Sequence, residues 1–582
     1  MQGPVLVANR GEIAWRVLRA CRERGLPTVA VYSEADRGAP WLAAADDALL
    51  LGPAPAAESY LDIAALLAAA ERSGADAVHP GYGFLAESAD FARAVTDAGL
   101  TWIGPPPKAI EAMGDKLSAR AAAEAAGAPV VPGTMEATDD PAVVRDFAAA
   151  HGYPVAIKAA YGGGGRGLKV VHGEAELAEA LEAAQREAVA AFGRGEVYLE
   201  RYLPRPRHIE IQVLADTHGH VIHLGERDCS TQRRHQKLIE EAPAPGLDEG
   251  VRAGMGEAAV RIAREVGYVG AGTCEFLYEE GGPAGAPAFY FLEMNTRLQV
   301  EHPVTELVTG HDLVHWQLQI AAGEPLDLAQ DDVALRGHAI EARINAEHVA
   351  QSFAPAPGRI TRWEPPSGPG VRVDAGVATG WEIPRDYDSL VAKVIGYGAD
   401  RDEARRKLLR ACEETIVEGV PTTLDFHRLA LTHDDFVAGR VSTISVEREW
   451  DLSGIPPAAP PEPGAGPPQP SRTVTVEVGG RHLEGALFEN HDRGEARRRK
   501  ATARSATGGG PGELTAPMQG TIVKAAVEPG DPVKAGDTIV VLEAMKMENP
   551  VAAARDGVVQ RLEVAPGDNV NAGALLAVIS DE

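Results

Sequence analysis

The sequence is poor in cysteine and in positive charge, and it contains no long hydrophobic run. Its four cysteines, Cys21, Cys229, Cys274 and Cys412, are too scattered for a disulfide framework or a metal-ligand spacing. With 84 acidic against 56 basic residues the net charge is −28, which repels nucleic acids and anionic membranes. No apolar run approaches the roughly 20 residues that a bilayer requires, and no secretory signal precedes the first strand. These absences predict a cytoplasmic protein that binds neither nucleic acid nor membrane.

A chain of 582 residues is long enough for several domains. The N-terminal part alternates apolar strand-like runs, such as 5–7 and 28–32, with an amphipathic helical segment at 12–23. This alternation predicts a parallel sheet with crossover helices. Alanine-rich helical sequence follows at 115–126 and 141–150, and the pattern is then mixed α+β to about residue 447.

The stretch 448–513 has the composition of a linker. Residues 456–470 are dense in proline, alanine and glycine, which indicates a semi-rigid extended segment. Residues 472–488 alternate as a short hairpin to which we assign no role. Residues 491–513 are basic and then glycine-rich; they either bind an acidic partner or, as we prefer, form a flexible tether of roughly 25 Å r.m.s. span.

Near the C-terminus the sequence repeats itself. Segments 520–536 and 557–573 each open on glycine, continue through a Pro-Gly-Asp turn and close on glycine. Such a repeat indicates one structural unit used twice, here short strands separated by turns. Lys546, within Glu543-Ala544-Met545-Lys546-Met547, falls between the copies, where a hairpin tip projects into solvent. The position predicts a lysine that carries a chemical group rather than an ordinary surface lysine.

A glycine-rich run follows Lys158, with five glycines among positions 162–167. It fits the letters of a dinucleotide-binding fingerprint, but that motif requires a strand before and a helix after, and here strand-like sequence stands on both sides. The run therefore predicts a hairpin whose bare backbone N–H groups close over phosphates, with Lys158 as a point charge. A mobile hairpin without a ligand is disfavoured because ordering so many glycines costs entropy.

Glu275, Glu293 and Asn295 form a candidate metal site. Residues two apart on a strand point to one face, and carboxylate and amide oxygens suit Mg²⁺ (or Mn²⁺). Acid pairs on strands are often only solvated, so the spacing alone leaves both interpretations open. With the glycine hairpin, the set resembles the ATP-grasp family, which joins a carboxylate to a nucleophile through an acyl phosphate.

The C-terminal segment resembles a biotinyl domain, with Ala516-Pro517-Met518 upstream of the attachment motif. A lipoyl domain is the closest alternative, because it carries a different group on the same lysine; methionines on both sides of Lys546 favour biotin. The resemblance implies biotin bound covalently to Lys546 and a biotin protein ligase that attaches it.

Several motifs in residues 3–447 resemble biotin carboxylase and occur in the same order. They are His79-Pro80-Gly81-Tyr82-Gly83-Phe84-Leu85, Met113-Gly114-Asp115-Lys116, Glu226-Arg227-Asp228-Cys229-Ser230, Gln232-Arg233-Arg234-His235-Gln236-Lys237, 293–303 and 337–343. So many independent matches make the resemblance specific.

The resemblance assigns residues of this sequence to each ligand. It implies that ATP phosphates lie against Lys116, Lys158, Gly163, Gly164, Gly165, Gly167 and His235, and adenine and ribose near Glu200, Leu203, His208 and Gln232. It implies Mg²⁺ at Glu275, Glu293 and Asn295, and bicarbonate at Lys237, Arg297, Gln299 and Val300. Glu301 is then the general base, Arg343 stabilises an enolate-like oxygen, and Tyr82 lines the biotin pocket.

Elementary chemistry agrees with these roles. Bicarbonate is an anion and a poor nucleophile, so it needs a cationic clamp, which Arg297 can supply bidentately. A carboxylate must take its proton as it attacks the γ-phosphate. Mg²⁺ and lysines offset the charge on the transferring phosphoryl group.

The resemblance implies an α/β biotin carboxylase followed by an all-β, lipoyl-like barrel. We expect a pre-ATP-grasp α/β domain at 1–114, an ATP-grasp α+β domain at 115–330 and an α+β C-terminal domain at 331–447. The linker with its hairpin occupies 448–513 and the carrier 514–582.

This fusion resembles the α subunit of bacterial acyl-CoA carboxylases, particularly the actinobacterial kind. Because nothing after Glu582 could supply a carboxyltransferase, we expect a separate β subunit that moves the carboxyl group to acetyl-CoA or propionyl-CoA, and a homo-oligomer formed through the biotin carboxylase part. A non-enzymatic carrier with a scaffolding N-terminal half is an alternative, and a pyruvate or urea carboxylase would need a longer chain.

Overall fold

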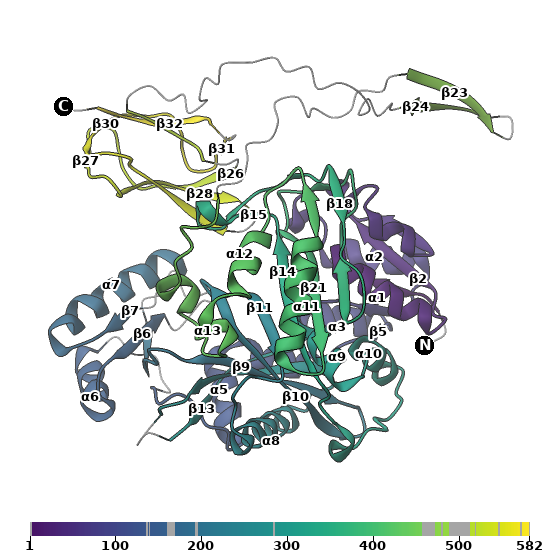
Figure 1. Ribbon diagram of the computed structural model, residues 1–582, viewed down its shortest axis with the longest axis horizontal. Coiled ribbons are helices and arrows are strands. Elements are labelled where there is room, and N and C mark those ends of the chain that lie inside the picture. The colour runs from purple at the N-terminus through teal and green to yellow at the C-terminus, as the bar shows by residue number, and fades with distance from the viewer. Residues whose placement is uncertain are drawn as a thin grey trace. The chain divides into compact units, whose positions relative to one another are not determined.

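The computed structural model describes 3–134, 138, 140–159, 169–192, 196–282, 286–456, 472–478, 481–487, 512–517, 520–544, 547–570 and 573–580. The chain forms two units (Figure 1). One contains nearly all residues up to Pro456, and the other contains the C-terminal residues from 457 onward.

The N-terminal part of the first unit is the predicted parallel sheet. Its strand order is β3-β2-β1-β4-β5, and every neighbouring pair is parallel. The elements are β1 (Val5–Val7), α1 (Gly11–Glu23), β2 (Thr28–Tyr32), β3 (Asp47–Leu50), α2 (Ile63–Ser73), β4 (Ala77–His79), α3 (Ala89–Asp97) and β5 (Thr101–Trp102). The prediction of an α/β beginning is confirmed.

A small three-stranded sheet follows, with order β7-β6-β8 and antiparallel pairing. It comprises β6 (Val155–Ala159), β7 (Lys169–Val171) and β8 (Val197–Arg201), with helices α6 (Pro141–His151) and α7 (Glu174–Phe192). Helices α4 (Pro107–Gly114) and α5 (Lys116–Ala125) precede it in the chain and belong to a different hydrophobic cluster. Val155 on β6 pairs with Val171 on β7, so the glycine run connects two antiparallel strands, as predicted. The glycines themselves lie outside the described residues.

An eight-stranded antiparallel sheet organises the rest of the first unit, in the order β13-β12-β9-β10-β11-β14-β21-β19. Its strands are β9 (Arg207–Ala215), β10 (Val221–Arg233), β11 (Gln236–Ala242), β12 (Gly270–Glu279), β13 (Ala288–Asn295), β14 (His338–Asn345), β19 (Val371–Ala375) and β21 (Leu390–Gly398). Because β11 pairs with β14, the segments predicted as separate ATP-grasp and C-terminal domains share one sheet.

Helices and short strands complete this unit. The helices are α8 (Glu249–Glu265), α9 (His302–Thr309), α10 (Leu313–Ala321), α11 (Arg401–Glu414), α12 (Leu424–Ala430) and α13 (Asp434–Val437). The short strands are β15 (Glu347–His348), β17 (Gly358–Arg359), β18 (Arg362–Glu364), β20 (Glu382–Ile383) and β22 (Ile416–Glu418), whereas the residues of β16 (Ala354–Pro355) are grouped with the second unit.

The two faces of the large sheet differ in chemistry, and β9 shows why. Along β9, Ile209, Ile211 and Val213 alternate with His208, Glu210 and Gln212, and all nine residues of the strand are buried. Alternate residues point to opposite faces. The apolar face packs with residues of α8, which are Met255, Ala258, Ala259, Ile262 and Ala263, in one hydrophobic cluster. The other face therefore buries charged and amide side chains, which is costly unless each finds a partner.

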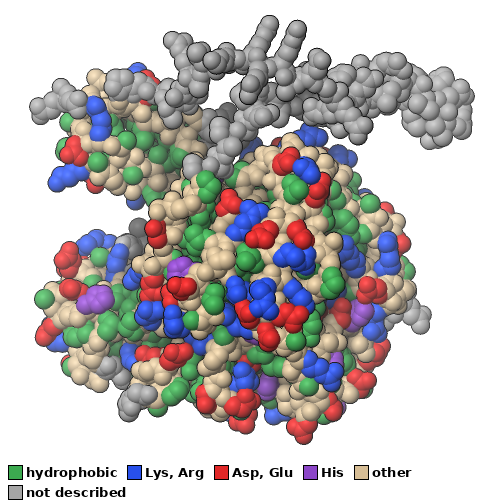
Figure 2. Space-filling view, in the orientation of Figure 1, with side chains coloured by type: hydrophobic (Ala, Val, Ile, Leu, Met, Phe, Trp, Pro, Cys, Tyr) green, Lys and Arg blue, Asp and Glu red, His purple; other side chains and the backbone are tan. Residues whose placement is uncertain are grey.

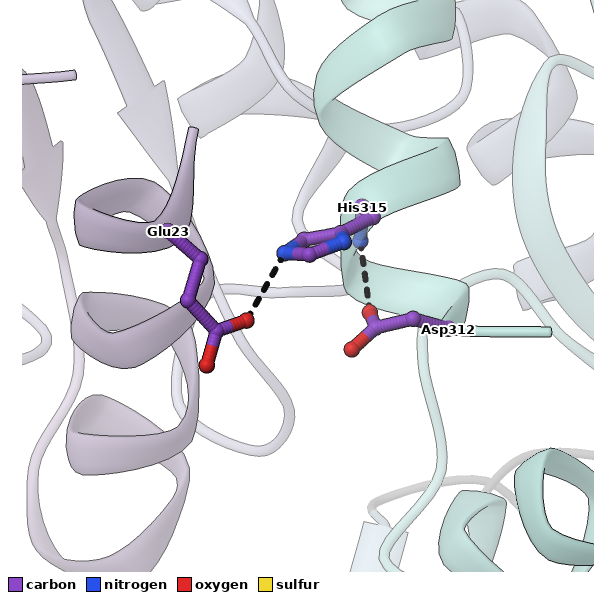
Figure 3. A group of neighbouring side chains, drawn as sticks. All are labelled: Glu23, Asp312 and His315. Atoms are coloured by element: carbon purple, nitrogen blue, oxygen red, sulfur yellow. Dashed lines mark hydrogen bonds and ion pairs between the residues drawn. The ribbon is translucent and has the colours of Figure 1, made fainter. Parts of the chain in front are cut away.

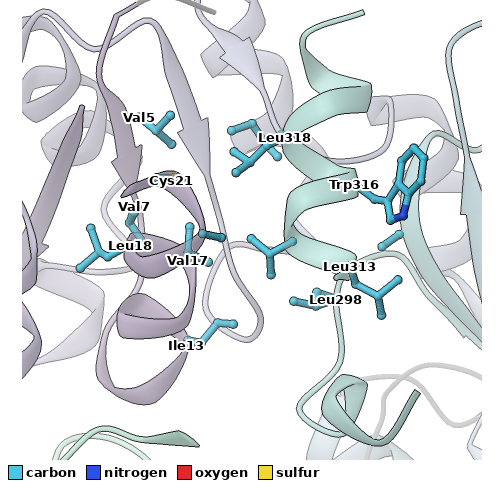
Figure 4. Close-up of a cluster of buried hydrophobic side chains, with 14 of the residues drawn as sticks. Val5, Val7, Ile13, Val17, Leu18, Cys21, Leu298, Leu313, Trp316 and Leu318 are labelled. Carbon is cyan, nitrogen blue, oxygen red and sulfur yellow. The ribbon is translucent and has the colours of Figure 1, made fainter. Parts of the chain in front are cut away.

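Helix α1 joins the parallel sheet to α10, almost 300 residues further along the chain. Ile13, Val17 and Leu18 of α1 lie in one buried cluster with Leu313 and Leu318 of α10 (Figure 4). At the edge of this contact the His315 ring pairs with Glu23 at 3.1 Å, and the Asp312 side chain caps α10 by accepting from the His315 backbone N–H (Figure 3). The same cluster contains Leu298, which anchors the segment before α9.

The surface mixes both signs of charge despite the net charge of −28. Figure 2 shows acidic and basic side chains interspersed over the face that carries α11. On that helix Arg405 pairs with Asp402 and Arg410 with Glu414, both at 2.7 Å. The acidic excess is thus not gathered into one patch on this face.

The second unit contains the repeated barrel. Its two four-stranded sheets have the orders β25-β32-β30-β27 and β29-β28-β26-β31. The strands are β25 (Glu513–Thr515), β26 (Gly520–Ala525), β27 (Pro532–Val533), β28 (Thr538–Ala544), β29 (Met547–Ala552), β30 (Gly557–Leu562), β31 (Asn569–Val570) and β32 (Leu575–Ser580). The two copies occupy equivalent places, since β26 pairs with β28 and β31 while β30 pairs with β32 and β27.

The Pro-Gly-Asp turns match in detail. Asp531 accepts from the Glu528 backbone N–H at 2.8 Å, and Asp568 accepts from the Ala565 backbone N–H at 2.7 Å. The glycine before each aspartate has φ near +100°, a conformation that favours glycine. One structural unit is used twice, as the repeat predicted.

Three further sequence predictions have structural outcomes. The 472–488 segment is a hairpin of β23 (Arg472–Val478) and β24 (Arg481–Leu487), whereas 457–471 and 488–511 lie outside the described residues. All four cysteines are buried and free. Among the helices that the structure describes, none combines the length and the apolar character needed to cross a bilayer.

Candidate active site

The polar face of the large sheet carries a row of charged residues across four strands. Glu293 on β13 pairs with Glu275 on β12, Glu275 with Glu210 on β9, and Glu210 with Arg227 on β10. Glu210 and Arg227 are completely buried. The Arg227 Nε lies 2.5 Å from Glu210 Oε1, and its other nitrogens donate to Gln212, Thr273, Gln299 and Thr305. Five satisfied donors explain how this guanidinium is tolerated inside the fold.

Lys237 is the electrostatic centre of the site. Its Nζ donates to Glu210 Oε2 at 2.6 Å, to Glu275 Oε1 at 2.9 Å and to Glu301 Oε1 at 2.7 Å. Burial alone would lower the pKa of Lys237, but the three carboxylates raise it well above its ordinary value. The ammonium is therefore charged at any physiological pH, and its three protons are directed at three acids.

Glu301, the predicted general base, lies between two cations. Its Oε2 accepts from Arg343 Nη2 at 2.9 Å, while its Oε1 accepts from Lys237. Burial opposes ionisation, but Lys237 and Arg343 hold the pKa of Glu301 well below its usual range. The carboxylate is thus ionised and able to accept a proton.

The structure also brings together the other residues predicted for the anion site. Arg297 donates to Asn295 Oδ1 at 2.8 Å and to Glu87 Oε2 at 2.9 Å. Gln299 donates to Glu275 Oε1 at 2.9 Å. Burial would lower the pKa of Arg297, but Glu87 and Glu301 raise it, so this guanidinium lies within electrostatic reach of the predicted base. A planar guanidinium can hold a small oxyanion.

The candidate metal ligands fit a hard divalent cation. Glu275 and Glu293 are direct cross-strand partners, and Asn295 is the second residue along β13 from Glu293. Desolvation, followed by the negative charge of Glu275, raises the pKa of Glu293, while His208, Lys116 and Lys237 oppose the shift. Carboxylate and amide oxygens are the ligands that Mg²⁺ prefers. His208, predicted near adenine and ribose, pairs with Glu275 at 3.0 Å and so lies at this metal end of the site.

The residues predicted for phosphate binding come from three separate elements. Lys116 is the first residue of α5, Lys158 lies on β6 and pairs with Glu200 on β8, and His235 lies in the β10–β11 turn. Partial burial lowers the pKa of His235, and the positive charges of Lys158 and Lys116 add to this shift. His235 has a φ of +64°, strained for a non-glycine residue. Because these cationic groups repel one another, an anionic ligand such as a phosphate would stabilise them by binding between them.

One of the residues predicted to lie near adenine, Leu203, has the apolar surroundings that a nucleobase requires. Leu203 is buried in a small cluster with Val131 and Tyr290, and Gln232 lies opposite Lys237 in the β10–β11 pairing.

Gly163, Gly164, Gly165, Gly167 and Lys546 lie outside the described residues. For Lys546 the surroundings are described: Ala544 pairs with Met547, so only two positions connect β28 to β29, and Lys546 is one of them.

Tyr82, predicted to line the biotin pocket, donates its hydroxyl hydrogen to Glu12 at the start of α1. The Tyr82 carbonyl accepts from Asn9 Nδ2 at 2.7 Å. Burial and the Glu12 carboxylate raise the pKa of the Tyr82 hydroxyl well above its ordinary value; Arg343 opposes the shift, so it lies within electrostatic reach of Tyr82.

Sequence reasoning missed several residues of the site, namely Glu12, Glu87, Glu210, Arg227, Glu240 and Lys393. A detectable signal existed for Glu210, because a strand that alternates isoleucine with charged residues and lies centrally in a sheet must bury those charges in pairs. Arg227 stood inside a quoted motif without an assigned role. For the remaining four, partners come from distant segments and no spacing indicates them.

Glu240 provides a pH-dependent prediction. It is completely buried on β11 and accepts from Arg343 Nε at 2.5 Å, yet burial raises its pKa to about 7. The folded protein therefore binds this proton more tightly than the unfolded chain between pH 4.5 and 7, so stability from this group falls as pH rises through that window. Relative to a Glu240→Gln variant, the wild type should lose about 3 kcal/mol of unfolding free energy between pH 4.5 and 8.

Urea unfolding followed by tryptophan fluorescence measures this difference, because all seven tryptophans lie before residue 456 and report the first unit. Asp46→Asn is a control carboxylate, since hydrogen bonds from Thr28 lower the pKa of Asp46. Its stability difference from the wild type should stay constant between pH 5 and 8, because Asp46 is ionised throughout that range in both the folded and the unfolded state. The prediction would be contradicted if the unfolding free energies of the wild type and of Glu240→Gln changed in parallel with pH.

Four family models match this chain. They are the biotin carboxylase N-terminal domain at 1–110, the ATP-binding domain of the carbamoyl-phosphate synthase L chain at 115–329, the biotin carboxylase C-terminal domain at 341–448 and the biotin-requiring enzyme domain at 512–579.

Two curated relatives illustrate the similarity. The biotin-dependent acyl-coenzyme A carboxylase alpha3 subunit of Mycobacterium leprae is 50% identical over 95% of this chain and 94% of its own length. The biotin carboxylase of Allochromatium vinosum is 52% identical over 77% of this chain and 98% of its own length.

Solved structures of similar fold cover the first unit. A biotin carboxylase–β-γ-ATP complex from Campylobacter jejuni has a TM-score of 0.73 and 44% identity over 77% of this chain and 99% of its own. The biotin carboxylase domain dimer of Hydrogenobacter thermophilus 2-oxoglutarate carboxylase, in complex with MgADP, ADP and bicarbonate, has a TM-score of 0.71 and 46% identity over 77% of this chain and 97% of its own.

Proposed function

Because this chain belongs to the family of biotin-dependent acyl-coenzyme A carboxylase alpha subunits, we propose that it carboxylates biotin on its own Lys546 at the expense of ATP and bicarbonate. The enzyme is a ligase with biotin carboxylase activity. The observation that carries the proposal is the buried cluster of Lys237, Glu301 and Arg343 beside the paired acids Glu275 and Glu293. The same cluster speaks against a scaffold without activity, since buried unreacting charges would only cost stability.

ATP binding divides among three groups of side chains. Lys116, Lys158 and His235, with the glycine run, hold the phosphates. Glu200, Leu203 and Gln232 border the nucleoside, and His208 stands where the nucleotide meets the metal ligand Glu275. Glu275, Glu293 and Asn295 hold Mg²⁺ or Mn²⁺, which when bound offsets charge on the transferring phosphoryl group. A structural relative solved with MgADP and bicarbonate supports both ligands.

Bicarbonate binding places an anion against Lys237 and Arg297, with Gln299 and the Val300 backbone completing the site. Glu301 takes the bicarbonate proton while a bicarbonate oxygen attacks the γ-phosphorus, and ADP leaves. The products are ADP and carboxyphosphate. Every atom of the transferred phosphoryl group is thereby accounted for.

The ionisation of Glu301 depends on what Lys237 binds. In the ligand-free site Lys237 and Arg343 both stabilise the Glu301 carboxylate and so make it a weak base. A bicarbonate ion competes for the protons of Lys237 and adds a negative charge nearby, which raises the pKa of Glu301. Substrate binding thus moves the base toward the pKa that proton abstraction at neutral pH requires.

The carboxyl group then reaches biotin beside Arg343 and Tyr82. Carboxyphosphate releases CO₂, the phosphate formed takes the ureido N–H proton of biotin, and the deprotonated nitrogen forms the new bond to the carbon of CO₂. Arg343 stabilises the oxygen that becomes enolate-like, because its guanidinium is fixed by Glu240 at 2.5 Å and by Glu301 at 2.9 Å.

An alpha subunit implies a carboxyltransferase partner, and similar biotin carboxylase structures are dimers. We propose further that the partner is a separate β subunit that carboxylates acetyl-CoA or propionyl-CoA. We also propose that a biotin protein ligase loads Lys546, that the biotin carboxylase part forms a homo-oligomer, and that the enzyme acts in the cytoplasm, where ATP is available.

The test is ATP hydrolysis by the purified full-length protein with and without bicarbonate, followed by transfer of labelled bicarbonate to free biotin. We expect ADP formation to require bicarbonate and to increase with free biotin. Lys237→Met should abolish both activities, because it removes the clamp and leaves three acids without their shared cation. Folded wild-type protein that hydrolyses no ATP under these conditions would overturn the proposal.

A further inference from the structure

Lys393 is a completely buried lysine for which the reaction above has no use. It lies on β21, and its side chain is among the largest that the fold buries fully. Its Nζ donates to the Val300 carbonyl at 2.9 Å and pairs with Glu12 Oε1 at 3.0 Å, while Asp374 Oδ2 is 3.9 Å away. A buried ammonium that binds a carbonyl next to the general base needs a functional explanation.

The contacts of Lys393 lead to residues assigned to both substrates of the proposed reaction. The Val300 carbonyl is one residue from Glu301, the base at the bicarbonate end. Glu12 accepts the Tyr82 hydroxyl on the same Oε1 atom that faces Lys393, and Tyr82 is at the biotin end. We call the series Tyr82, Glu12, Lys393 and the Val300 carbonyl the Lys393 bridge.

The bridge connects three segments that are far apart in sequence. Glu12 begins α1, Lys393 belongs to the far part of the large sheet, and Val300 lies in the segment between β13 and α9. A side chain at Gly376 would meet the Glu12 backbone N at 2.5 Å, so this glycine permits α1 to start directly against the sheet. The close approach places Glu12 within reach of Lys393.

The neighbours of the bridge are themselves held in place. Asp374 pairs with Arg372 at 2.7 Å, and Arg372 reaches Glu306 on α9 at 2.7 Å. Glu306 in turn pairs with Arg16 on α1 at 2.8 Å. This second series of ion pairs closes a ring around Lys393, so the ammonium has little freedom to leave the Val300 carbonyl.

We propose that Lys393 is a positioning residue that, through Glu12, sets the Val300–Glu301 peptide and the Tyr82 ring in a fixed relation. The need follows from the chemistry of the proposed function, on which this inference rests. Carboxyphosphate formed at Glu301 must release CO₂ close to biotin, and misplacement of reacting groups by 1 Å costs on the order of 10²-fold in rate. A carbonyl that is hydrogen-bonded to a buried ammonium is held rigidly. The Val300 carbonyl can therefore fix the position of the Val300–Glu301 peptide relative to the Tyr82 ring.

The experiment compares three variants of the full chain: Glu12→Gln, Lys393→Met and the double variant. Lys393→Met alone leaves Glu12 as an unpaired buried charge and is expected to fold poorly. The double variant removes both charges, so it restores folding while the bridge stays broken. Arg401→Met is the matched control, since it breaks another partly buried pair, with Glu241 at 2.6 Å, away from the site.

The readouts are KM for bicarbonate, KM for ATP and the ATP consumed per carboxylated free biotin. For the double variant we expect KM for bicarbonate to rise about 10-fold or more and the ATP consumed per product to rise with it, within the range that misplacement allows. KM for ATP should stay within about twofold, because no contact of the bridge reaches the residues assigned to ATP. The control should change none of the three.

Two results would overturn the inference. One is a folded double variant with wild-type KM for bicarbonate and wild-type coupling. The other is an equal loss toward ATP and bicarbonate that Arg401→Met reproduces, which indicates a role in stability alone. Failure of the proposed function is distinguishable, since it shows as missing bicarbonate-dependent ATP hydrolysis in the wild type.

Discussion

Replacing Glu301 by alanine is expected to lower biotin carboxylation by about 10³-fold, the middle of the range for losing a general base. Glu301 is 2% exposed and lies between the Lys237 ammonium and the Arg343 guanidinium. In the variant no carboxylate at this point can take the bicarbonate proton. Steady-state transfer of labelled bicarbonate to free biotin measures the loss.

ATP affinity should change little in the same variant, because Glu301 contacts none of the residues assigned to the nucleotide. Folding should also survive. Lys237 keeps Glu210 and Glu275, and Arg343 keeps Glu240, so each cation retains a carboxylate. Equilibrium nucleotide binding and thermal unfolding provide these controls. Wild-type turnover in a folded Glu301→Ala protein would show that the base is another group.

Substituting Lys546 by arginine is expected to abolish acyl-CoA carboxylation by the assembled enzyme while sparing carboxylation of free biotin. An arginine guanidinium stays protonated at neutral pH and cannot be acylated by biotin as a lysine amine can. The change falls between the described strands β28 and β29 and exchanges one long cationic side chain for another, so the carrier should fold normally. The measurements are the mass of the peptide containing position 546 and both activities.

Lys534→Arg is the matched control for Lys546→Arg. Lys534 is an exposed lysine of the same unit, and its backbone N–H donates to Asp537 in a turn that does not lie between the repeats. The control should keep its biotin and both activities. If Lys546→Arg loses carboxylation of free biotin as well, then the two units do not act separately and the proposed division of labour is incorrect.

The sequence predicted the fold in considerable detail where local pattern decides it. The run of apolar residues at Val5–Val7 and the amphipathic helix after it are confirmed, as are the 472–488 hairpin and the repeated turns at Asp531 and Asp568. These features depend on periodicity and on glycine conformation, which act over a few residues. The sharing of one sheet by β11 and β14 was not predicted, because strand pairing across about 100 residues leaves no local pattern.

For the site, the sequence by itself predicted which residues carry the proposed chemistry. Lys237, Glu301 and Arg343 stand in motifs, and Lys546 stands between two copies of a repeat. Motifs and repeats are defined by the order of residues along the chain, so they can be identified without a three-dimensional structure.

Only the tertiary structure decided how these charges are balanced. Lys237 is paired with three acids because β9 lies between β12 and β10, which brings Glu210 and Glu275 to it, while the segment before α9 contributes Glu301. The ionisation state of Glu301 and the existence of the Lys393 bridge both follow from that arrangement of strands. Electrostatic energy depends on distance and burial in space, and neither quantity is encoded in the spacing of residues along the sequence.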